Sequence, residues 1–289
     1  MLTERARAKV NLSLRVRGRR SDGYHDLESV VAFADCADRL TLEAGAEPGL
    51  RITGALAAAC GEVADNLVLK AARLLAEAVP DLRVGSFALE KVLPVAAGIG
   101  GGSADAAAAL RLLARLNGLS LEDPRLQEVA LRSGADVPVC LLSRGSVMRG
   151  IGERIVPLDV PEMACVMVNP RLPVPTAAVF QALGLEKGSR LHKVDEDRQD
   201  WPQRAALSDW IAHLAGIAND LEVPAIAIQP VIGEVLEALR RSRGALLARM
   251  SGSGATCFAI FGKAGEAEAA ARAIRQAQPS WWVHAGSLS

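Results

Sequence analysis

Alternating apolar and polar positions predict strands in the first half of the chain. In residues 8–16 every second residue is apolar, and Lys9 and Asn11 share the polar face. Residues 27–33 and 40–43 predict two further strands. In residues 86–92 apolar and polar positions also alternate, which favours a half-exposed strand over the continuous apolar strand of a parallel sheet.

Helical periodicity and capping residues predict the helices of this half. We expect helices over residues 67–78, 104–116 and 125–133. Asn66 is placed to cap the first, and Gly134 closes the last. Residues 145–158 are interpreted as a crossover between the two halves.

The second half shows a different order of elements. Strands are expected over 164–168, 245–250, 256–261 and 282–285, and helices over 176–183, 205–214, 230–241 and 264–276. Without the extra helices the order is β-α-β-β-α-β, the split arrangement of ferredoxin-like domains. Residues 186–204 are charged and irregular, which indicates a surface excursion. We therefore predict an α+β protein with an N-terminal mixed α/β nucleotide-binding domain over 1–150 and a ferredoxin-like domain over 151–289.

A glycine-rich loop leads into the alanine-rich helix. Residues 93–109 read LPVAAGIGGGSADAAAA, with Ser103 where a helix N-cap belongs. Glycines opening onto a helix N-terminus form a phosphate cradle, because amide hydrogens and the positive helix end face one concavity. The P-loop lysine and the last glycine of the dinucleotide pattern are both missing. The sequence predicts nucleotide binding, with a ligand-free linker as the alternative.

Composition narrows the class of protein. The chain has 289 residues, is 50% hydrophobic, and balances 33 basic against 33 acidic side chains. Zero net charge argues against nucleic acid as a partner. Five scattered cysteines without CxxC spacing indicate a reducing compartment and no metal site. Since no apolar run approaches membrane-spanning length, we expect a soluble cytoplasmic protein without a membrane partner.

Several polar residues are candidates for chemistry. Lys9 and Asn11 project in parallel and could hold a hydroxyl and a phosphate, or form a solvated strand face. Asp136 could be a general base or an Asp-Pro turn residue. Tyr24 and His25 follow a turn and could stack on a base, or close a hairpin. Residues 251–254, SGSG, fit a tight hairpin as well as a second phosphate-facing loop.

Taken together, these positions resemble the galactokinase–homoserine kinase–mevalonate kinase–phosphomevalonate kinase (GHMP) superfamily. The resemblance rests on AKVNL at residues 8–12, the PxxxGxGGGSA pattern at 94–104 and SGSGA at 251–255. Four further motifs resemble those members that phosphorylate a cytidylated sugar alcohol for non-mevalonate isoprenoid synthesis. They are DGYH at 22–25, DNL at 65–67, GADVP at 134–138 and ND at 219–220.

The resemblance implies a reaction and the residues that perform it. ATP, with Mg²⁺ carried on the nucleotide, would phosphorylate the 2-hydroxyl of the alcohol; Asp136 would take the proton and Lys9 would stabilise charge. Asn11, Tyr24, His25, Thr176 and Phe180 would bind the alcohol and its cytosine. The ATP contacts would be Asn66, Lys91, Pro94, Val95, Ala96, Ala97, Gly98, Ile99, Gly100, Gly101, Gly102, Ser103 and Ala104.

Two positions depart from many relatives, which carry serine in place of Ala104 and asparagine in place of Asp105. An acid at Asp105 suits the helix dipole but would repel phosphate if it turned inward.

Rival hypotheses are a kinase of the same superfamily acting on mevalonate or homoserine, a non-catalytic nucleotide-binding module, and a dinucleotide oxidoreductase. Retention of Lys9 and Asp136 disfavours the non-catalytic module. Assays against the three alcohols would separate the kinases, and tighter binding of NADH than ATP would support the oxidoreductase.

Overall fold

The computed structural model describes residues 1–191, 201–202 and 205–289, so most of the expected excursion over 186–204 lies outside the described residues. The chain divides into two compact units assembled from alternating segments. The first comprises Met1–Lys9, Cys36–Val95 and Gly100–Ser143, and the second Val10–Asp35, Ala96–Ile99 and Arg144–Ser289. Strand β3 (His25–Ala44) contributes residues to both units. The division into contiguous domains at residue 150 stays a prediction.

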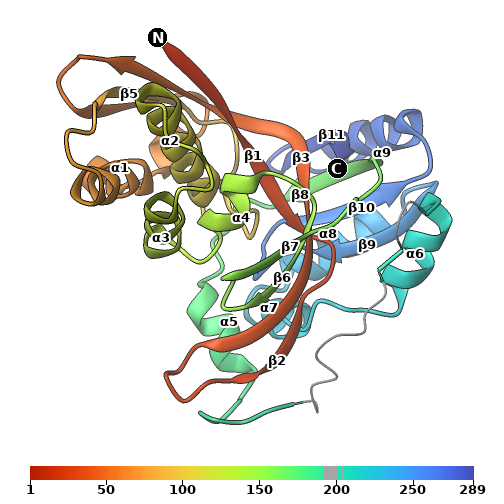
Figure 1. Ribbon diagram of the computed structural model, residues 1–289. Coiled ribbons are helices and arrows are strands. Elements are labelled where there is room, and N and C mark those ends of the chain that lie inside the picture. The colour runs from red at the N-terminus through yellow and green to blue at the C-terminus, as the bar shows by residue number, and fades with distance from the viewer. Residues whose placement is uncertain (192–200, 203–204) are drawn as a thin grey trace. The chain divides into compact units, whose positions relative to one another are not determined.

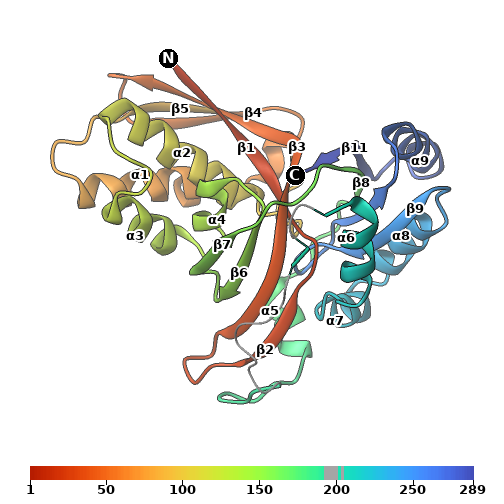
Figure 2. The same cartoon turned by 45° about the vertical axis from the view of Figure 1, so that its right-hand side comes forward.

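The first unit combines a small sheet with helices (Figure 1). Strand β5 (Gly85–Glu90) pairs antiparallel with β3 and parallel with β4 (Gly49–Thr53), and β1 (Leu2–Asn11) also pairs with β3. The helices are α1 (Leu67–Ala78), α2 (Gly101–Asn117), α3 (Pro124–Ser133) and α4 (Val137–Leu142). In both overall views α1, α2 and α3 lie together on one side of β4 and β5 (Figure 2).

Local chemistry explains where these helices begin. The Asn66 side chain accepts a hydrogen bond from the Val68 amide at 2.9 Å, which confirms the predicted cap of α1. Asp123 caps α3 in the same way through the Arg125 amide, and proline occupies the first helical position. The alanine run of α2 is almost wholly buried, and its small side chains let α1 and α4 pack closely against it.

Two expectations about the early strands are wrong. The predicted strand over 8–16 ends at Asn11, and a second strand, β2 (Arg15–Arg19), follows. The polar positions Lys9, Asn11 and Ser13 are all buried, which contradicts the alternative of a solvated strand face. The two strands predicted over 27–33 and 40–43 are parts of the single 20-residue strand β3.

In the second unit, β2 and the first half of β3 form an antiparallel hairpin. Strand β6 (Ser146–Gly150) pairs with β3 and with β7 (Arg154–Pro157), so the crossover expected over 145–158 is in fact a second hairpin. Its turn uses positive φ angles at Gly150 and Gly152, which glycine adopts at little cost.

The ferredoxin-like order is confirmed. Strands β8 (Met163–Asn169), β9 (Ala245–Met250), β10 (Cys257–Phe261) and β11 (Trp282–Leu288) lie in the order β11-β8-β10-β9, with every adjacent pair antiparallel. Helices α8 (Val231–Arg240) and α9 (Ala264–Ala277) bury their apolar faces against this sheet, in a core that includes Val166, Leu236 and Phe261. Helices α5 (Thr176–Ala182) and α6 (Leu207–Ala215) match predicted helices, whereas α7 (Glu222–Ile228) was not expected. No helix among the described residues is long and apolar enough to cross a membrane.

Candidate active site

The first unit brings Lys9 and Asp136 into direct contact. Lys9 Nζ lies 2.8 Å from Asp136 Oδ2. The lysine side chain is 5% exposed and that of the aspartate 35% exposed. Strand β1 supplies the lysine, and Asp136 stands at the N-terminus of α4. The pair therefore holds a carboxylate in a fixed position while leaving it open to solvent on one side.

The last residues of the glycine loop lie beside this pair. Gly100 caps α2 with φ +63°, and a Cβ there would lie 3.4 Å from Lys9 Cβ and Cε and 3.8 Å from Asp136 Oδ2. The helix thus begins at Gly101, and the prediction that Ser103 caps it is wrong, because Ser103 lies in the first turn. The free amide groups of that turn open next to the two charged side chains.

Gly101 faces inward. A Cβ built on it would lie 3.4 Å from Lys91 Nζ and 3.7 Å from the Pro94 carbonyl oxygen. A side chain at Gly101 would press on the protein beneath the loop and not extend toward a bound phosphate.

Two of the expected ATP contacts are engaged in bonds within the protein. Asn66 uses its side-chain oxygen to cap α1, whose Leu67 lies 3.6 Å from where a Gly102 Cβ would be. Lys91 is buried, and its amine lies 2.6 Å from a carboxylate oxygen of both Asp38 and Asp105. The Lys91 amine therefore supports the base of the loop, and its role as an ATP contact stays a prediction.

In the second unit, the middle of the loop packs on the turn at residues 251–254. Ser251 Oγ donates to the Gly98 carbonyl at 2.9 Å, and the Thr256 amide donates to the Ala97 carbonyl at 3.1 Å. A Cβ at Gly98 would collide with the Ser251 carbonyl oxygen and lie 2.8 Å from the Gly254 amide nitrogen. The close approach of the two backbones requires glycine at this point, so the SGSG segment supports the loop.

Asn11 belongs to the same network. Its backbone amide donates to Ser251 Oγ at 3.0 Å, and its side-chain amide donates to Ser29 Oγ at 2.7 Å. Its side-chain oxygen is buried and has no hydrogen-bond partner among the described residues. This oxygen can accept a hydrogen bond from a ligand. Because the Asn11 side chain is buried and bonded within the protein, the residue is largely structural. Asn219 fixes the far side of the turn by donating to the Met250 and Gly252 carbonyls, each at 2.8 Å.

The predicted aromatic site is partly assembled. His25 and Phe180 stack with ring centroids 4.7 Å apart and planes 28° apart. A base between them would need about 7 Å, two ring-contact distances, so these two rings contact each other instead of framing a base. Tyr24 is 60% exposed and leaves an open aromatic surface beside His25. Thr176, at the start of α5, exchanges a 2.8 Å hydrogen bond with Ser253.

His25 is held in its neutral form. Burial first, and then the charge of Arg19, lower the pKa of His25 below its ordinary value of 6.5. A neutral ring suits stacking in this partly apolar place.

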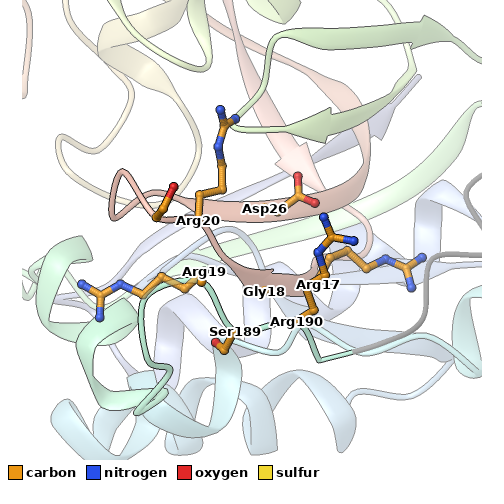
Figure 3. Close-up of a pocket in the computed structure, with 9 residues that line it drawn as sticks. Arg17, Gly18, Arg19, Arg20, Asp26, Ser189 and Arg190 are labelled. Atoms are coloured by element: carbon orange, nitrogen blue, oxygen red, sulfur yellow. The ribbon is translucent and has the colours of Figure 1, made fainter.

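Sequence reasoning missed a basic pocket next to these residues. The pocket, about 330 Å³ in volume, is lined by Arg17, Arg19, Arg20 and Arg190 together with Ser189 and Asp26 (Figure 3). Arg17 pairs with Glu28 at 2.8 Å, and Arg19 donates to the Leu185 carbonyl at 2.9 Å. The RGRR run at 17–20 was the available signal, but nothing in it showed that residues near 189 would close the pocket.

Asp38 was also missed. It precedes a strand-like segment of ordinary composition and gives no motif, yet it is fully buried against Lys91. Only tertiary structure reveals that partnership.

Comparison with known proteins identifies the family. The model described as GHMP kinases N terminal domain matches residues 66–144, and the one described as GHMP kinases C terminal matches 203–280. A 4-diphosphocytidyl-2-C-methyl-D-erythritol kinase of Bradyrhizobium diazoefficiens is 69% identical over 100% of this chain and 98% of its own length. The chain belongs to the GHMP kinase family. Members transfer phosphate from ATP to small molecules, and this chain is an enzyme of that kind.

Other relatives of the GHMP kinase family agree in fold. A protein of the same name from Rhodopseudomonas palustris is 64% identical over 99% of this chain and 95% of its own length. A crystal structure of 4-(cytidine 5'-diphospho)-2C-methyl-D-erythritol kinase matches with a TM-score of 0.77 and 35% identity, covering 100% of this chain and 99% of that one. A homoserine kinase from Cytophaga hutchinsonii shares the fold at a TM-score of 0.66 and 20% identity, over 99% of this chain and 94% of its own.

Proposed function

We propose that this GHMP kinase transfers the γ-phosphate of ATP to the 2-hydroxyl group of 4-diphosphocytidyl-2-C-methyl-D-erythritol, a step of the non-mevalonate route to isoprenoid precursors. The observation that carries the chemistry is the Lys9–Asp136 pair, 2.8 Å apart beside Gly100 at the end of the glycine loop. The choice of alcohol rests on the relatives, which bear the name of that kinase at 60–70% identity.

Each group of the site has a distinct role in the transfer. Asp136 accepts the hydroxyl proton as the alcohol oxygen bonds to the γ-phosphorus and the bond to the departing ADP breaks. Lys9 holds the Asp136 carboxylate in place and offers positive charge to the transferring group. The amides at the start of α2 receive the phosphates, because the helix dipole there favours anions. Positioning and charge neutralisation supply most of such a rate enhancement.

Magnesium fits as an ion that arrives on the nucleotide. The carboxylates around the loop are each paired with a lysine, Asp136 with Lys9, and Asp38 and Asp105 with Lys91. When bound, the ion would neutralise charge on the phosphate oxygens. The cytoplasmic location indicated by the cysteine pattern stays a prediction.

The cytosine site is proposed at Tyr24, His25 and Phe180. The exposed Tyr24 ring gives the base a surface to stack on, and His25, the next residue of the chain, stacks on Phe180.

A phosphate-transfer assay with three alcohols tests the function. Purified protein, ATP and Mg²⁺ are incubated with the diphosphocytidyl alcohol, mevalonate or homoserine, and ADP release is followed together with the phosphorylated product. We expect turnover with the diphosphocytidyl alcohol alone. Turnover of mevalonate or homoserine at a higher kcat/KM would replace the proposed substrate while leaving the kinase chemistry intact.

A further inference from the structure

In the first unit, three charged side chains form a cluster beneath the start of α2, where the glycine loop ends. Lys91 follows β5 directly, and its amine lies 2.6 Å from both Asp38 Oδ2 and Asp105 Oδ2. All three side chains are at most 3% exposed. The second oxygen of Asp38 accepts the amides of Val92 and Leu93, at 2.6 and 2.9 Å. The cluster therefore bonds the backbone that enters the loop.

The cluster holds one negative charge too many. Two carboxylates face a single ammonium, and an uncompensated buried charge is costly. Asp38 is satisfied by Lys91 and two amides, whereas Asp105 Oδ1 is buried without a hydrogen-bond partner in the part of the chain that the structure describes. A proton that relieves the excess charge therefore belongs on Asp105.

The pKa shifts of Asp105 and Lys91 agree with a proton on Asp105. Burial raises the pKa of Asp105 to about 7, although Lys91 opposes the shift and Asp38 adds to it. Burial alone would lower the pKa of Lys91, but the charges of Asp105 and Asp38 outweigh it and raise that pKa, so the amine stays protonated. The charges of the cluster act in turn on two thiols, Cys60 and, from α4, Cys140, and Lys9 and Asp136 act on Cys140 as well. Burial raises the pKa of each thiol, so both are neutral near pH 7.

The cluster also lies at the N-terminal end of α2, where the phosphates of ATP are proposed to bind. Asp105 is the fifth residue of that helix, and a Cβ on Gly101, its first residue, would lie 3.4 Å from the Lys91 amine. A negative charge in this place occupies the same positive helix end that would attract a phosphate.

We propose that Asp105 is a positioning residue whose charge sets the affinity of the glycine loop for the phosphates of a nucleotide, with Lys91 acting through the loop and not by contact. The proposal rests on nucleotide binding as stated under the proposed function. When Asp105 is protonated the cluster is neutral and the loop binds phosphate more tightly. When it is ionised the cluster carries one negative charge and repels phosphate.

The test compares wild type with Asp105→Asn between pH 6 and 8.5. Calorimetry gives the Kd for the magnesium complex of adenylyl imidodiphosphate, and steady-state assays give KM for ATP and kcat at each pH. Both proteins see the same titration of the nucleotide itself, so the ratio of their Kd values isolates the side chain. Glu90→Gln is the matched control, since it removes an exposed carboxylate at the end of β5.

We expect the ratio of wild-type to Asp105→Asn Kd to rise about three- to tenfold from pH 6 to 8.5, the size of a partly screened charge interaction. The Glu90→Gln ratio should stay flat, and kcat should change less than KM. If Asp105→Asn unfolds, Asp105→Ser replaces it. A ratio that is constant with pH would overturn the proposal, as would a variant that folds but no longer binds nucleotide at pH 6.

The same data separate this proposal from the proposed function. Wild type that binds the analogue with the expected pH dependence but phosphorylates none of the alcohols would overturn the function and support the role of Asp105. Absence of nucleotide binding at every pH would overturn both.

Discussion

At the scale of single residues, the Lys9–Asp136 pair explains how a polar strand position becomes buried. A lone ammonium with 5% exposure would be strongly destabilising, and Asp136 supplies the charge that compensates it. A general base must also be reachable by the substrate hydroxyl, and the Asp136 side chain is 35% exposed. A solvated strand face and a simple turn were the two alternatives for these residues, and neither alternative produces a 2.8 Å contact between them.

Asp136→Asn tests the base. The variant keeps the shape of the side chain but removes the basic oxygen, so we expect kcat to fall by about 10²–10⁴ while nucleotide affinity changes little. Steady-state kinetics with the diphosphocytidyl alcohol, together with calorimetry for the nucleotide, measure the two quantities separately.

Lys9→Met is the companion variant, because it removes the positive charge without altering the carboxylate. A loose transition state that needs little help from a base predicts only a small loss in Asp136→Asn. If Asp136→Asn kept more than about half the wild-type rate while Lys9→Met was inactive, Asp136 would be a turn residue and the base would lie elsewhere.

Tyr24→Ala tests the cytosine surface. Stacking contributes about 1–3 kcal/mol per base, so KM for the diphosphocytidyl alcohol should rise about 5- to 150-fold while KM for ATP stays near wild type. Because the ring is 60% exposed, thermal unfolding should hardly change. Tyr24→Phe retains the ring and should retain most of the affinity.

Phe180→Leu extends the same test to the other ring. Phe180 packs against the core of the second unit, so leucine is chosen to keep its volume while ending the stack on His25. We expect KM for the alcohol to rise by a smaller factor than in Tyr24→Ala. Equal losses for the alcohol and for ATP in both variants would mean that the substitutions disturb the fold in general and that these rings do not bind the cytosine.

At the scale of elements, α2 carries a left-handed glycine at each end. Gly100 has φ +63° at the N-cap and Gly118 has φ +66° at the C-cap. A Cβ on Gly100 would stand over Lys9 and Asp136, whereas one on Gly118 would have nothing within 4 Å. The two positions impose the same backbone requirement and differ only in what lies nearby.

Gly100→Ala and Gly118→Ala should therefore lose similar stability but different activity. Each forces alanine into a left-handed conformation at a cost of about 1–2 kcal/mol. We expect kcat/KM for ATP to fall by more than about tenfold in Gly100→Ala only, because its methyl group narrows the space beside the catalytic pair. Denaturant unfolding and kinetics on both proteins give the comparison; equal activity in the two variants would move the phosphate site away from Gly100.

Most elements could be predicted because their signals are local. The cap at Asn66, the helix over 264–276 and the strand over 245–250 follow from neighbouring residues and agree closely with the structure. The predictions fail where pairing with a distant segment determines the structure. Whether residues 8–16 form one strand, and whether 145–158 cross over or turn back, depends on pairing with β3, which leaves no mark on the local pattern.

The candidate site likewise contains residues that the sequence could predict and residues that it could not. The loop, Lys9 and Asp136 could be proposed from motifs, because phosphate binding and proton transfer restrict residue types within short segments. The partners of Lys91 could not be predicted, since Asp38 lies 53 positions earlier and only folding brings its Oδ2 atom to 2.6 Å from Lys91 Nζ. The direct stack of His25 on Phe180, in place of an open gap, was also beyond what spacing can show.

At the scale of the whole molecule, a chain with equal numbers of basic and acidic residues still buries an unequal cluster. Asp38, Lys91 and Asp105 place two carboxylates against one ammonium in the first unit. Global stability must then depend on pH, because the folded state holds a proton on Asp105 that the unfolded chain releases.

The direction of that dependence is fixed by the pKa values. Folding raises the pKa of Asp105 from 3.8 to about 7, so between these values the folded protein binds more protons than the unfolded chain. The stabilising contribution is complete below pH 4, declines as the pH rises, and is lost above about pH 7. Between pH 5.5 and 8 a group with a folded pKa near 7 loses about 2 kcal/mol of this contribution, so wild type should lose about 4–8 °C more in Tm than Asp105→Asn does. Differential scanning calorimetry of wild type, Asp105→Asn and Glu90→Gln measures it, with Glu90→Gln following wild type. Parallel Tm curves for wild type and Asp105→Asn would mean that Asp105 stays ionised in the folded protein, with its excess charge compensated by a group outside the Asp38–Lys91–Asp105 cluster.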